Sequence, residues 1–304
     1  MTAISERPAL AIDIGGTKIA LAIVRDGQVR ERRQIATPRS GRGADIVAAI
    51  AEQAAQFEEA PIVGVATTGI VDDGHLTALN PATLPIEDRF PLVDTLRTLL
   101  GRPVLAINDA QAAAWAEYRL GAGKGTERMA FVTVSTGIGA GLVLDGQLQS
   151  GPRGLAGHIG HMVGDPAGPP CGCGRRGCVE RLASGTAIGE LGGRVLGRSV
   201  TAPEVFAAAA AAAAAGDRQC DAVIDAAAAA LASVFCDLVA ALDLERIVLG
   251  GGVGLAPGFL ERLTQSINEQ PGIFRRPVLR AAMGADAGLV GVAALADERS
   301  FHLK

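Results

Sequence analysis

Residues 9–32 read ALAIDIGGTKIALAIVRDGQVRER, and this stretch decides what fold the chain can adopt. β-forming residues lie on both sides of a Gly15–Gly16–Thr17 turn, and an Asp26–Gly27 pair follows. Gly-rich and Asp-Gly turns between apolar runs are typical of the tight connections that join antiparallel strands. The stretch therefore predicts successive antiparallel strands.

A second stretch repeats these features in the same order. Residues 129–151, MAFVTVSTGIGAGLVLDGQLQSG, contain a strand, a turn of small residues, a strand, Asp145–Gly146–Gln147 and another strand, and Asp26–Gly27–Gln28 is the matching turn of the first copy. The match predicts a duplicated α/β unit, one copy opening each of two domains. A chain of 304 residues is long enough for two domains that share a cleft, because one domain typically has roughly 100 to 200 residues.

Strand-like and helical segments alternate through the rest of the chain, which predicts mixed or parallel sheets flanked by helices. The helical segments are 44–57, 90–101, 109–123, the Ala run 207–215 ended by Gly216, a helix from about 217 to 241, the segment 257–270, and a closing helix from about 286. The strand-like segments are 61–71, 103–107 and the start of 246–254. Ala is the best helix former, so the Ala run predicts ordered helix rather than disorder.

Composition narrows the classes of partner. The net charge is −4 and only 3% of residues are aromatic, whereas a nucleic-acid binder needs clustered cations and often stacking rings. The first thirteen residues contain no apolar run typical of a signal sequence, and no uncharged apolar stretch of about 20 residues is convincing as a membrane span. We expect a cytoplasmic protein that binds small molecules, with no nucleic acid and no membrane. The five cysteines, an odd number, argue against a disulfide framework.

Two turns have the composition of a phosphate site. In Asp13–Lys18, adjacent glycines let backbone N–H groups converge while Thr17 and Lys18 add a hydroxyl and a cation, although an ordinary hairpin turn is the alternative. Ser135–Gly141 occupies the equivalent turn of the second copy. The Walker A pattern is absent, and a strand rather than a helix follows the second turn, which excludes a Rossmann fingerprint. One such turn in each domain predicts a nucleotide held by both.

Two further segments lie at strand ends, where open α/β sheets bind ligands. Gly250–Gly252 would let a flat ring or a ribose approach the backbone, although a tight strand-to-helix turn also accounts for these glycines. In Asn108–Asp109 the carboxylate could accept the proton of an attacking hydroxyl while Asn108 binds another hydroxyl. The alternative is that Asp109 is only a helix N-cap.

The segment CGCGRRGC at 171–178 supplies thiols, and His161 lies ten residues before it. Cys171, Cys173, Cys178 and His161 complete a set of three thiolates and one imidazole, which fills the tetrahedral shell of a structural Zn²⁺. A C-x-x-C redox pair is absent, and a disulfide would leave one thiol over. The segment therefore predicts a structural zinc site.

These motifs together resemble a known family. DIGGTK, STGIG, HIGH followed by CGCGRRGCVE, and IVLGGGV occur over essentially the whole chain in the order seen in the ROK family of sugar kinases and repressors. The likeness is greatest to the family's bacterial N-acetylmannosamine kinases, through TTGIVDDGHLTALNP (67–81), INDAQAAAWAE (107–117) and LAGHIGHMVGDPAGP (155–169). The resemblance implies an α/β chain with the two-domain actin-like ATPase (ribonuclease H-like) fold, a mixed sheet in each domain and an interdomain cleft.

The domains would be 1–108 and 109–286, with the zinc loop in the second and a closing helix at about 287–304 packed back on the first. The resemblance implies ATP-dependent phosphorylation of O6 of N-acetyl-D-mannosamine, with Mg²⁺ carrying the nucleotide, a homodimer and a role in sialic-acid catabolism. It makes Asp109 the general base and His161, Cys171, Cys173 and Cys178 the zinc ligands. Sugar contacts would be Gly69, Asn80, Asn108, His158, His161 and Glu180. ATP contacts would be Ala11, Ile12, Asp13, Ile14, Gly15, Gly16, Thr17, Lys18, Thr136, Gly137, Ile138, Gly139, Ala140, Gly141, Leu142, Val143, Leu144, Gly250 and Gly251.

His158 departs from part of the family pattern. Glucokinases of the family have Glu in a G-E-x-G-H segment, whereas this chain has an imidazole, which can donate a hydrogen bond. The change puts glucose in doubt, although a glucokinase or another amino-sugar kinase stays an alternative, as does His158 as an unused zinc candidate or a residue behind the site. A sugar-responsive regulator is the other class, but regulators carry a helix-turn-helix before the DIGGTK-like motif, and only twelve residues precede Asp13.

Overall fold

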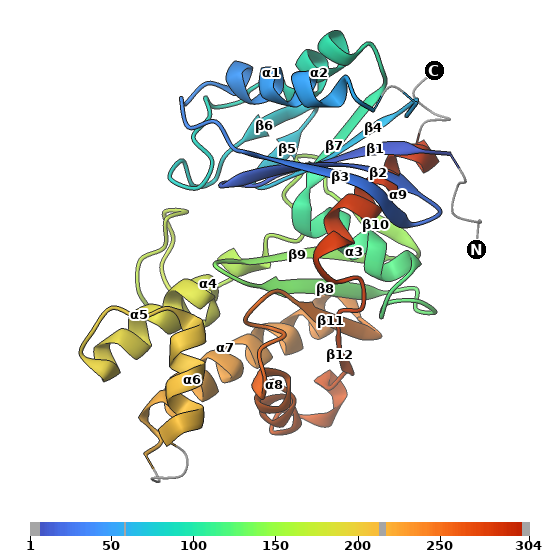
Figure 1. Cartoon of the computed structure of the whole chain (residues 1–304). Helices are drawn as coiled ribbons and strands as arrows, with labels where there is room; N and C mark the ends of the chain where they lie inside the picture. The colour runs from blue at the N-terminus through green and yellow to red at the C-terminus, as the bar shows by residue number, and fades with distance from the viewer. Residues whose placement is uncertain (1–6, 58, 213–216, 300–304) are drawn as a thin grey trace. The chain divides into compact units, whose positions relative to one another are not determined.

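The structure is a computed structural model that describes residues 7–57, 59–212 and 217–299 (Figure 1). The chain forms two compact units: unit 1 comprises Met1–Lys124, Leu148–Ala156 and Met283–Lys304, and unit 2 comprises Gly125–Gln147 and Gly157–Ala282, apart from the residues outside the described ranges. This division differs from the expected boundary between residues 108 and 109. Helix α3 (Asp109–Arg119) belongs to unit 1, because it packs along the closing helix α9 (Ala287–Arg299).

Unit 1 is built on a five-stranded mixed sheet. Its strands are β1 (Ala9–Ile14), β2 (Lys18–Arg25), β3 (Gln28–Ala36), β4 (Val63–Thr67) and β7 (Val104–Asn108), in the spatial order β3-β2-β1-β4-β7. The β1-β2 and β2-β3 pairs are antiparallel, whereas β1-β4 and β4-β7 are parallel. The first quoted stretch therefore forms the three antiparallel strands of this sheet.

Helices cover both faces of this sheet (Figure 1). Side chains alternate between the faces of a strand, so Val63 and Val65 of β4 enter the apolar core shared with α1 (Gly43–Ala54) and α2 (Leu92–Leu100). Gly64 points the other way, where a Cβ would lie 2.6 Å from the carbonyl oxygen of Val292 in α9. A short ladder of β5 (Ile70–Asp72) and β6 (His75–Thr77) follows β4, and the 3₁₀ turn η4 (Gly284–Asp286) precedes α9. Residues 300–304, predicted to continue the closing helix, lie outside the described residues.

A second five-stranded mixed sheet has the same connectivity, and all of its residues except Leu148 and Gln149 belong to unit 2. Its strands are β8 (Met129–Val134), β9 (Ile138–Leu144), β10 (Gln147–Gln149), β11 (Arg246–Gly250) and β12 (Val278–Arg280), in the order β10-β9-β8-β11-β12. The β8-β9 pair is antiparallel, and β8-β11 and β11-β12 are parallel. The helical elements are η1 (Ile159–His161), α4 (Glu180–Ala183), α5 (Gly185–Leu196), α6 (Ala202–Ala212), α7 (Gln219–Leu242), α8 (Phe259–Asn268) and η3 (Gly272–Phe274).

The two Asp-Gly pairs have the same backbone conformation. Asp26 and Gly27 have φ of 52° and 69°, and Asp145 and Gly146 have φ of 53° and 73°. Two consecutive residues with positive φ match the type I′ turn, whose twist suits a two-residue β-hairpin. The predicted hairpins and the predicted duplication are therefore both present in the structure.

Helix α7 is the long apolar helix of unit 2. It has 24 residues, a mean hydropathy of 1.9 in its most apolar window, and 56% of that window buried, so by length and composition alone it could cross a membrane. Its buried side chains, Leu231 and Phe235 among them, belong to the core of unit 2, which is the position of a core helix. Helix α6 contains the start of the Ala run, and residues 213–216, which include its predicted end at Gly216, lie outside the described residues.

Candidate functional site

The carboxyl ends of the parallel strands β1, β4 and β7 meet at one edge of the unit 1 sheet. Asp13 of β1 pairs in register with Ala66 of β4, and Thr67 pairs with Asn108, the last residue of β7. Asp109 follows directly as the first residue of α3. This edge is where open α/β sheets bind ligands, and it brings two carboxylates into one region.

Asn108 is the residue that caps α3. Its side-chain oxygen accepts from the backbone N–H groups of Ala110 and Gln111, at 2.9 Å and 3.3 Å, and its side-chain nitrogen donates to the carbonyl oxygen of Gly69 at 3.0 Å. The hypothesis that Asp109 is only an N-cap is therefore wrong, since Asn108 is the N-cap residue of α3. Asn108 is buried and its polar atoms are used within the protein, so it holds the start of α3 and the Gly69 loop together.

Asp109 has a perturbed carboxyl. Its residue surface is partly exposed, yet burial of the carboxyl, and then the negative charge of Asp13, raise its pKa from 3.8 to about 6. Hydrogen bonds from the backbone of Ala110 and from Asn108 oppose this shift without cancelling it. Burial also raises the pKa of Asp13, against the cations Lys18 and Arg32. A carboxylate with a pKa near 6 is suited to accept a proton at neutral pH.

The Asp13–Lys18 turn joins β1 to β2. The N–H of Gly15 donates to the carbonyl oxygen of Lys18 at 3.0 Å, and the hydroxyl of Thr37 donates to the carbonyl oxygen of Gly15 at 2.7 Å. Thr17 and Lys18 are exposed, whereas Ala11, Ile12 and Ile14 are fully buried in β1. Of the predicted ATP-binding stretch, Thr17 and Lys18 therefore offer side chains to a ligand, whereas Ala11, Ile12 and Ile14 do not.

Two of the predicted sugar-contacting residues lie in loops of unit 1. Gly69 has a φ of 99°, and a Cβ there would lie 2.6 Å from the carbonyl oxygen of Thr77, so only glycine fits this position. Asn80 is exposed, and its side-chain oxygen accepts from the backbone N–H of Ala82 at 3.0 Å. Asn80 therefore shapes the start of its own loop.

The second phosphate-like turn lies between β8 and β9 of unit 2. The N–H of Ser135 donates to the carbonyl oxygen of Gly137 at 2.9 Å, and Glu180 accepts from the N–H of Ile138 at 2.9 Å. Ala140, Leu142 and Val143 are buried in β9, so they have only backbone atoms to offer a nucleotide. Glu180, predicted to contact sugar, has one carboxylate oxygen bound to this turn, and its sugar contact stays a prediction.

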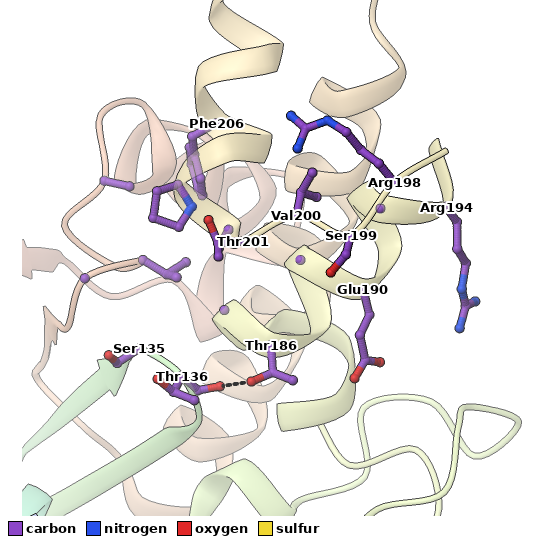
Figure 2. A pocket seen from close by; sticks show the side chains of 18 of the residues that line it. Ser135, Thr136, Thr186, Glu190, Arg194, Arg198, Ser199, Val200, Thr201 and Phe206 are labelled. Atoms are coloured by element: carbon purple, nitrogen blue, oxygen red, sulfur yellow. Dashed lines mark hydrogen bonds between the residues drawn. The ribbon is translucent and has the colours of Figure 1, made fainter. Parts of the chain in front are cut away.

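A cavity of about 1280 Å³ opens beside this turn, within unit 2 (Figure 2). We call it the unit 2 cavity. Its walls come from the Ser135–Thr136 turn, one face of α5, the α5-α6 connection, Phe206 of α6 and the segment 252–257. Thr186 donates its hydroxyl to the carbonyl oxygen of Thr136 at 2.9 Å, which ties α5 to the turn (Figure 2).

Sequence analysis did not predict most of this lining. Gly185, Gly189 and Gly193 recur every four residues and lie on one face of α5, where a Cβ would crowd the carbonyl oxygens of Ser135, Val200 and Arg198 respectively. That spacing, visible in GTAIGELGG, is the signal that could have pointed to one wall of the cavity. The Glu204 carboxylate accepts hydrogen bonds from the N–H and the hydroxyl of Thr201. The hydrogen bond from the Thr201 N–H, and then the one from Arg198, lower the pKa of Glu204 to about 2.

Gly250–Gly252 form the turn after β11. Gly251 has a φ of 84°, and a Cβ there would overlap the carbonyl oxygen of Val134. Gly252 lines the unit 2 cavity. The tight turn is therefore a property of Gly251, whereas the approach of a ring or ribose to this segment stays a prediction.

The four predicted metal ligands lie together. The imidazole of His161 and the thiols of Cys171, Cys173 and Cys178 have ligand atoms all within 4.8 Å of one another. His161 Nδ1 is 3.7 Å from Cys171 Sγ, and Cys173 Sγ is 3.6 Å from Cys178 Sγ. A tetrahedral zinc with Zn–S bonds of about 2.3 Å separates its ligand atoms by about 3.8 Å. The donor set and its spacing fit such an ion.

The cluster lies in a partly buried loop. Burial, together with hydrogen bonds to Cys173 and Cys171, raises the pKa of the Cys178 thiol to about 12. Arg175 donates to the carbonyl oxygen of His161 at 2.7 Å and closes the loop around the cluster. Among the residues that the structure describes, His158 is not one of the four clustered ligands. The backbone N–H of His161 donates to the carbonyl oxygen of His158.

The pattern of one protein family, described as the ROK family, matches residues 9–299. This chain belongs to the ROK family. The match spans both units, so the duplicated sheets, the unit 1 carboxylates, the cysteine cluster and the unit 2 cavity are all parts of one ROK domain.

Comparison with known ROK proteins gives relatives over nearly the whole chain. The N-acetylmannosamine kinase of Yersinia pestis (strain Pestoides F) is 50% identical over 288 residues, which cover 93% of this chain and 96% of the relative. The ROK hexokinase from Thermus thermophilus has a TM-score of 0.86 and 35% identity, covering 97% of this chain and 99% of that one. A ROK family glucokinase from Streptomyces griseus, solved with glucose and AMPPNP, has a TM-score of 0.77 and 31% identity, covering 96% and 99%. The α/β fold with two mixed sheets is therefore the fold of the ROK sugar kinases, as predicted.

Proposed function

We propose that this ROK protein transfers the γ-phosphoryl group of ATP to O6 of N-acetyl-D-mannosamine. The observation that carries the proposal is the 50% identity, over 93% of the chain, to a relative named N-acetylmannosamine kinase. The carboxyl pair of Asp13 and Asp109 at the edge of the unit 1 sheet supports it, because a kinase of this kind needs a base for the attacking hydroxyl.

Asp109 is proposed as that base. Its pKa of about 6 leaves it mostly ionised at neutral pH, yet basic enough to take the proton from O6–H as the oxygen attacks phosphorus. Asn108 caps α3 and hydrogen-bonds to Asp109, so it orients the carboxylate that it precedes. A positioned general base contributes typically about 10²- to 10⁴-fold in rate. The remainder of the acceleration would come from positioning and charge neutralisation at the phosphoryl group.

The unit 2 cavity is proposed to hold the adenosine part of ATP. Its volume of about 1280 Å³ exceeds what the nucleoside needs, and Phe206 and Val200 give it an apolar wall beside the hydroxyls of Thr136 and Thr186. The exposed hydroxyl and cation of Thr17 and Lys18 in unit 1 are suited to phosphate oxygens. Mg²⁺ bound with the nucleotide would offset the charge of its phosphates.

His161, Cys171, Cys173 and Cys178 are proposed as the ligands of a structural zinc. With four protein ligands the shell is closed, so the ion would stabilise the loop and supply no reactive water. The loop contains Gly174 and Gly177 at φ of 88° and 68°, which regular secondary structure does not use. His158, His161 and Glu180 remain predicted sugar contacts on the strength of the resemblance, as do the homodimer and the cytoplasmic location.

A second candidate is phosphorylation of glucose. The similar structures include a hexokinase at 35% identity and a glucokinase at 31% identity, so the family likeness alone admits several hexoses. The departure at His158 favours the acetamido sugar, because an imidazole can donate a hydrogen bond to an acetyl oxygen and a carboxylate cannot.

The test is an ADP-release assay with purified protein, ATP and one sugar at a time: N-acetylmannosamine, N-acetylglucosamine, mannose and glucose. We expect kcat/KM to be highest for N-acetylmannosamine by at least about tenfold, the discrimination that a single well-made hydrogen bond supplies. A higher kcat/KM for glucose would replace the proposal with the second candidate. Absence of ADP release with all four sugars would reject both.

A further inference from the structure

Arg39 makes a set of contacts that the proposed chemistry does not explain. Its Nη1 donates to the carbonyl oxygens of Gly16 and Thr83, at 2.9 Å and 3.1 Å, and its Nη2 donates to the carbonyl oxygen of Ala82 at 2.9 Å. Gly16 belongs to the phosphate-like turn, whereas Ala82 and Thr83 follow Asn80, a predicted sugar contact. One exposed guanidinium therefore joins two loops separated by more than 60 residues of sequence.

The two loops also touch directly. A Cβ at Gly16 would lie 2.5 Å from the carbonyl oxygen of Thr83 and 2.9 Å from its Cγ2, so glycine is required at 16 by the neighbouring loop. The segment 80–84, which we call the Asn80 loop, is closed by hydrogen bonds from Thr83 and Leu84 to the carbonyl oxygen of Asn80, and Leu84 is fully buried. The Asn80 loop is thus a compact piece that rests on the phosphate-like turn.

The segment that carries Arg39 is itself fixed to the turn. Thr37, which is buried, donates its hydroxyl to the carbonyl oxygen of Gly15, and its N–H to that of Thr17 at 3.1 Å. Arg39, two residues later, then extends over Gly16 to the far loop. A planar guanidinium with several N–H groups in a fixed fork can satisfy carbonyls from two directions, and a lysine ammonium on a flexible stem cannot hold both loops in one geometry.

We propose that Arg39 is a positioning residue that couples the phosphate-binding turn to the sugar-binding loop. It holds the backbone of Gly16 and the Asn80 loop in one arrangement, so a ligand that orders either loop orders both. This inference rests on the proposed function for the identity of the two ligands, and on the contacts alone for the coupling of the loops.

The first test is hydrogen exchange on the ligand-free protein, which needs no activity. In Arg39→Met, which keeps the apolar stem and loses every donor, we expect amide exchange to rise in both 15–17 and 82–84. Arg42→Met is the matched control: Arg42 is an exposed arginine of the same segment whose pairing is with Asp45 at 3.5 Å, and it should leave both segments unchanged. Faster exchange in one segment alone, or in neither, would overturn the proposal.

The second test is steady-state kinetics. Arg39→Met should raise KM for ATP and KM for the sugar together, each by about tenfold, the factor that corresponds to about 1.4 kcal/mol. The acid limb of kcat set by Asp109 should not move, because Arg39 does not contact Asp109. A lower melting temperature with both KM values unchanged would make Arg39 merely structural. A change in one KM only would also overturn the proposed coupling.

Arg39→Lys covers the case in which Arg39→Met does not fold. It keeps the charge but cannot span the two loops, so it should show the same paired changes at smaller size, and wild-type behaviour in both measurements would refute the coupling. If the wild-type protein phosphorylates none of the sugars, the proposed function fails, while the exchange measurement still decides the role of Arg39.

Discussion

Asp109→Asn should make the protein more stable while it removes most of the turnover. The pKa of Asp109 is raised from 3.8 to about 6, a difference of about 2 units, and each unit corresponds to about 1.4 kcal/mol. Keeping this carboxylate ionised in the folded protein therefore costs up to about 3 kcal/mol at neutral pH. Asn removes the charge and keeps an oxygen that can accept from the N–H of Ala110, as Asp109 does at 2.8 Å.

The pH dependence of this gain follows from linkage. The folded-state pKa lies above the unfolded one, so the cost is absent below about pH 3.8, grows as pH rises through about 6, and is complete above about pH 7. Because part of the residue is exposed, we expect a gain of about 1 to 3 kcal/mol at pH 7.5, which falls to about a third of that value near pH 4.5 and toward zero below about pH 3.8.

The chain provides its own probe for this measurement. Trp115 is the only tryptophan, and it is buried in α3, the helix that Asp109 begins. Urea unfolding followed by its fluorescence therefore reports on unit 1 at each pH. Asp94→Asn is the control, since Asp94 is exposed and pairs with Arg97 on the surface of α2. An Asp109→Asn variant no more stable than wild type at pH 7.5, or a gain of equal size at pH 4.5, would refute the burial argument.

Three further predictions concern other parts of the molecule. Wild-type kcat/KM should fall about tenfold per pH unit below about pH 6, because the base is then protonated. Asp13→Asn should move this acid limb to lower pH, because the charge of Asp13 raises the pKa of Asp109. An acid limb that does not move in the pH–rate profile of Asp13→Asn would contradict this. Cys173→Ser should lower both the zinc content, measured by atomic absorption, and the melting temperature. Cys220 is a buried cysteine outside the cluster, so Cys220→Ser should keep its zinc. Full zinc occupancy in Cys173→Ser would exclude Cys173 as a ligand. Gly251→Ala should lower the free energy of unfolding by at least about 2 kcal/mol, because the φ of Gly251 is 84° and a Cβ would overlap the carbonyl oxygen of Val134. A Cβ at Gly252 meets nothing within 4 Å, so Gly252→Ala should be tolerated. Equal denaturation midpoints for the two variants would count against this account.

The success of the sequence predictions depended on how local each feature is. The Asp-Gly turns, the duplicated strand order and the metal cluster were all predictable, because the residues that make each of them lie close together in the chain. His161 and the three cysteines share one loop, and their donor chemistry admits few alternatives. The steric need for glycine at position 69 could not be predicted, because the atom that excludes a Cβ belongs to Thr77, on another strand.

Features made by distant segments could not be predicted in the same way. Sequence alone left Asp109 as either a base or a cap, and the structure shows Asn108 capping α3 instead. The unit 2 cavity combines the turn at Ser135 with α5, α6 and the segment after β11, and no single stretch contains enough of it to suggest its shape. The contact of the Glu180 carboxylate with the N–H of Ile138 could not be predicted either, because the two residues lie in distant segments of the chain.

The sequence by itself determined the fold class, the family and the candidate ligands, because strand period, turn chemistry and ligand type depend on neighbouring residues. Only the tertiary structure decided which of those residues have perturbed chemistry. Burial and the charge of Asp13 set the pKa of Asp109, and the packing of the Asn80 loop on Gly16 brings carbonyl oxygens of two loops within reach of Arg39. Desolvation and contact between distant segments exist only in the folded chain, so no local pattern encodes them.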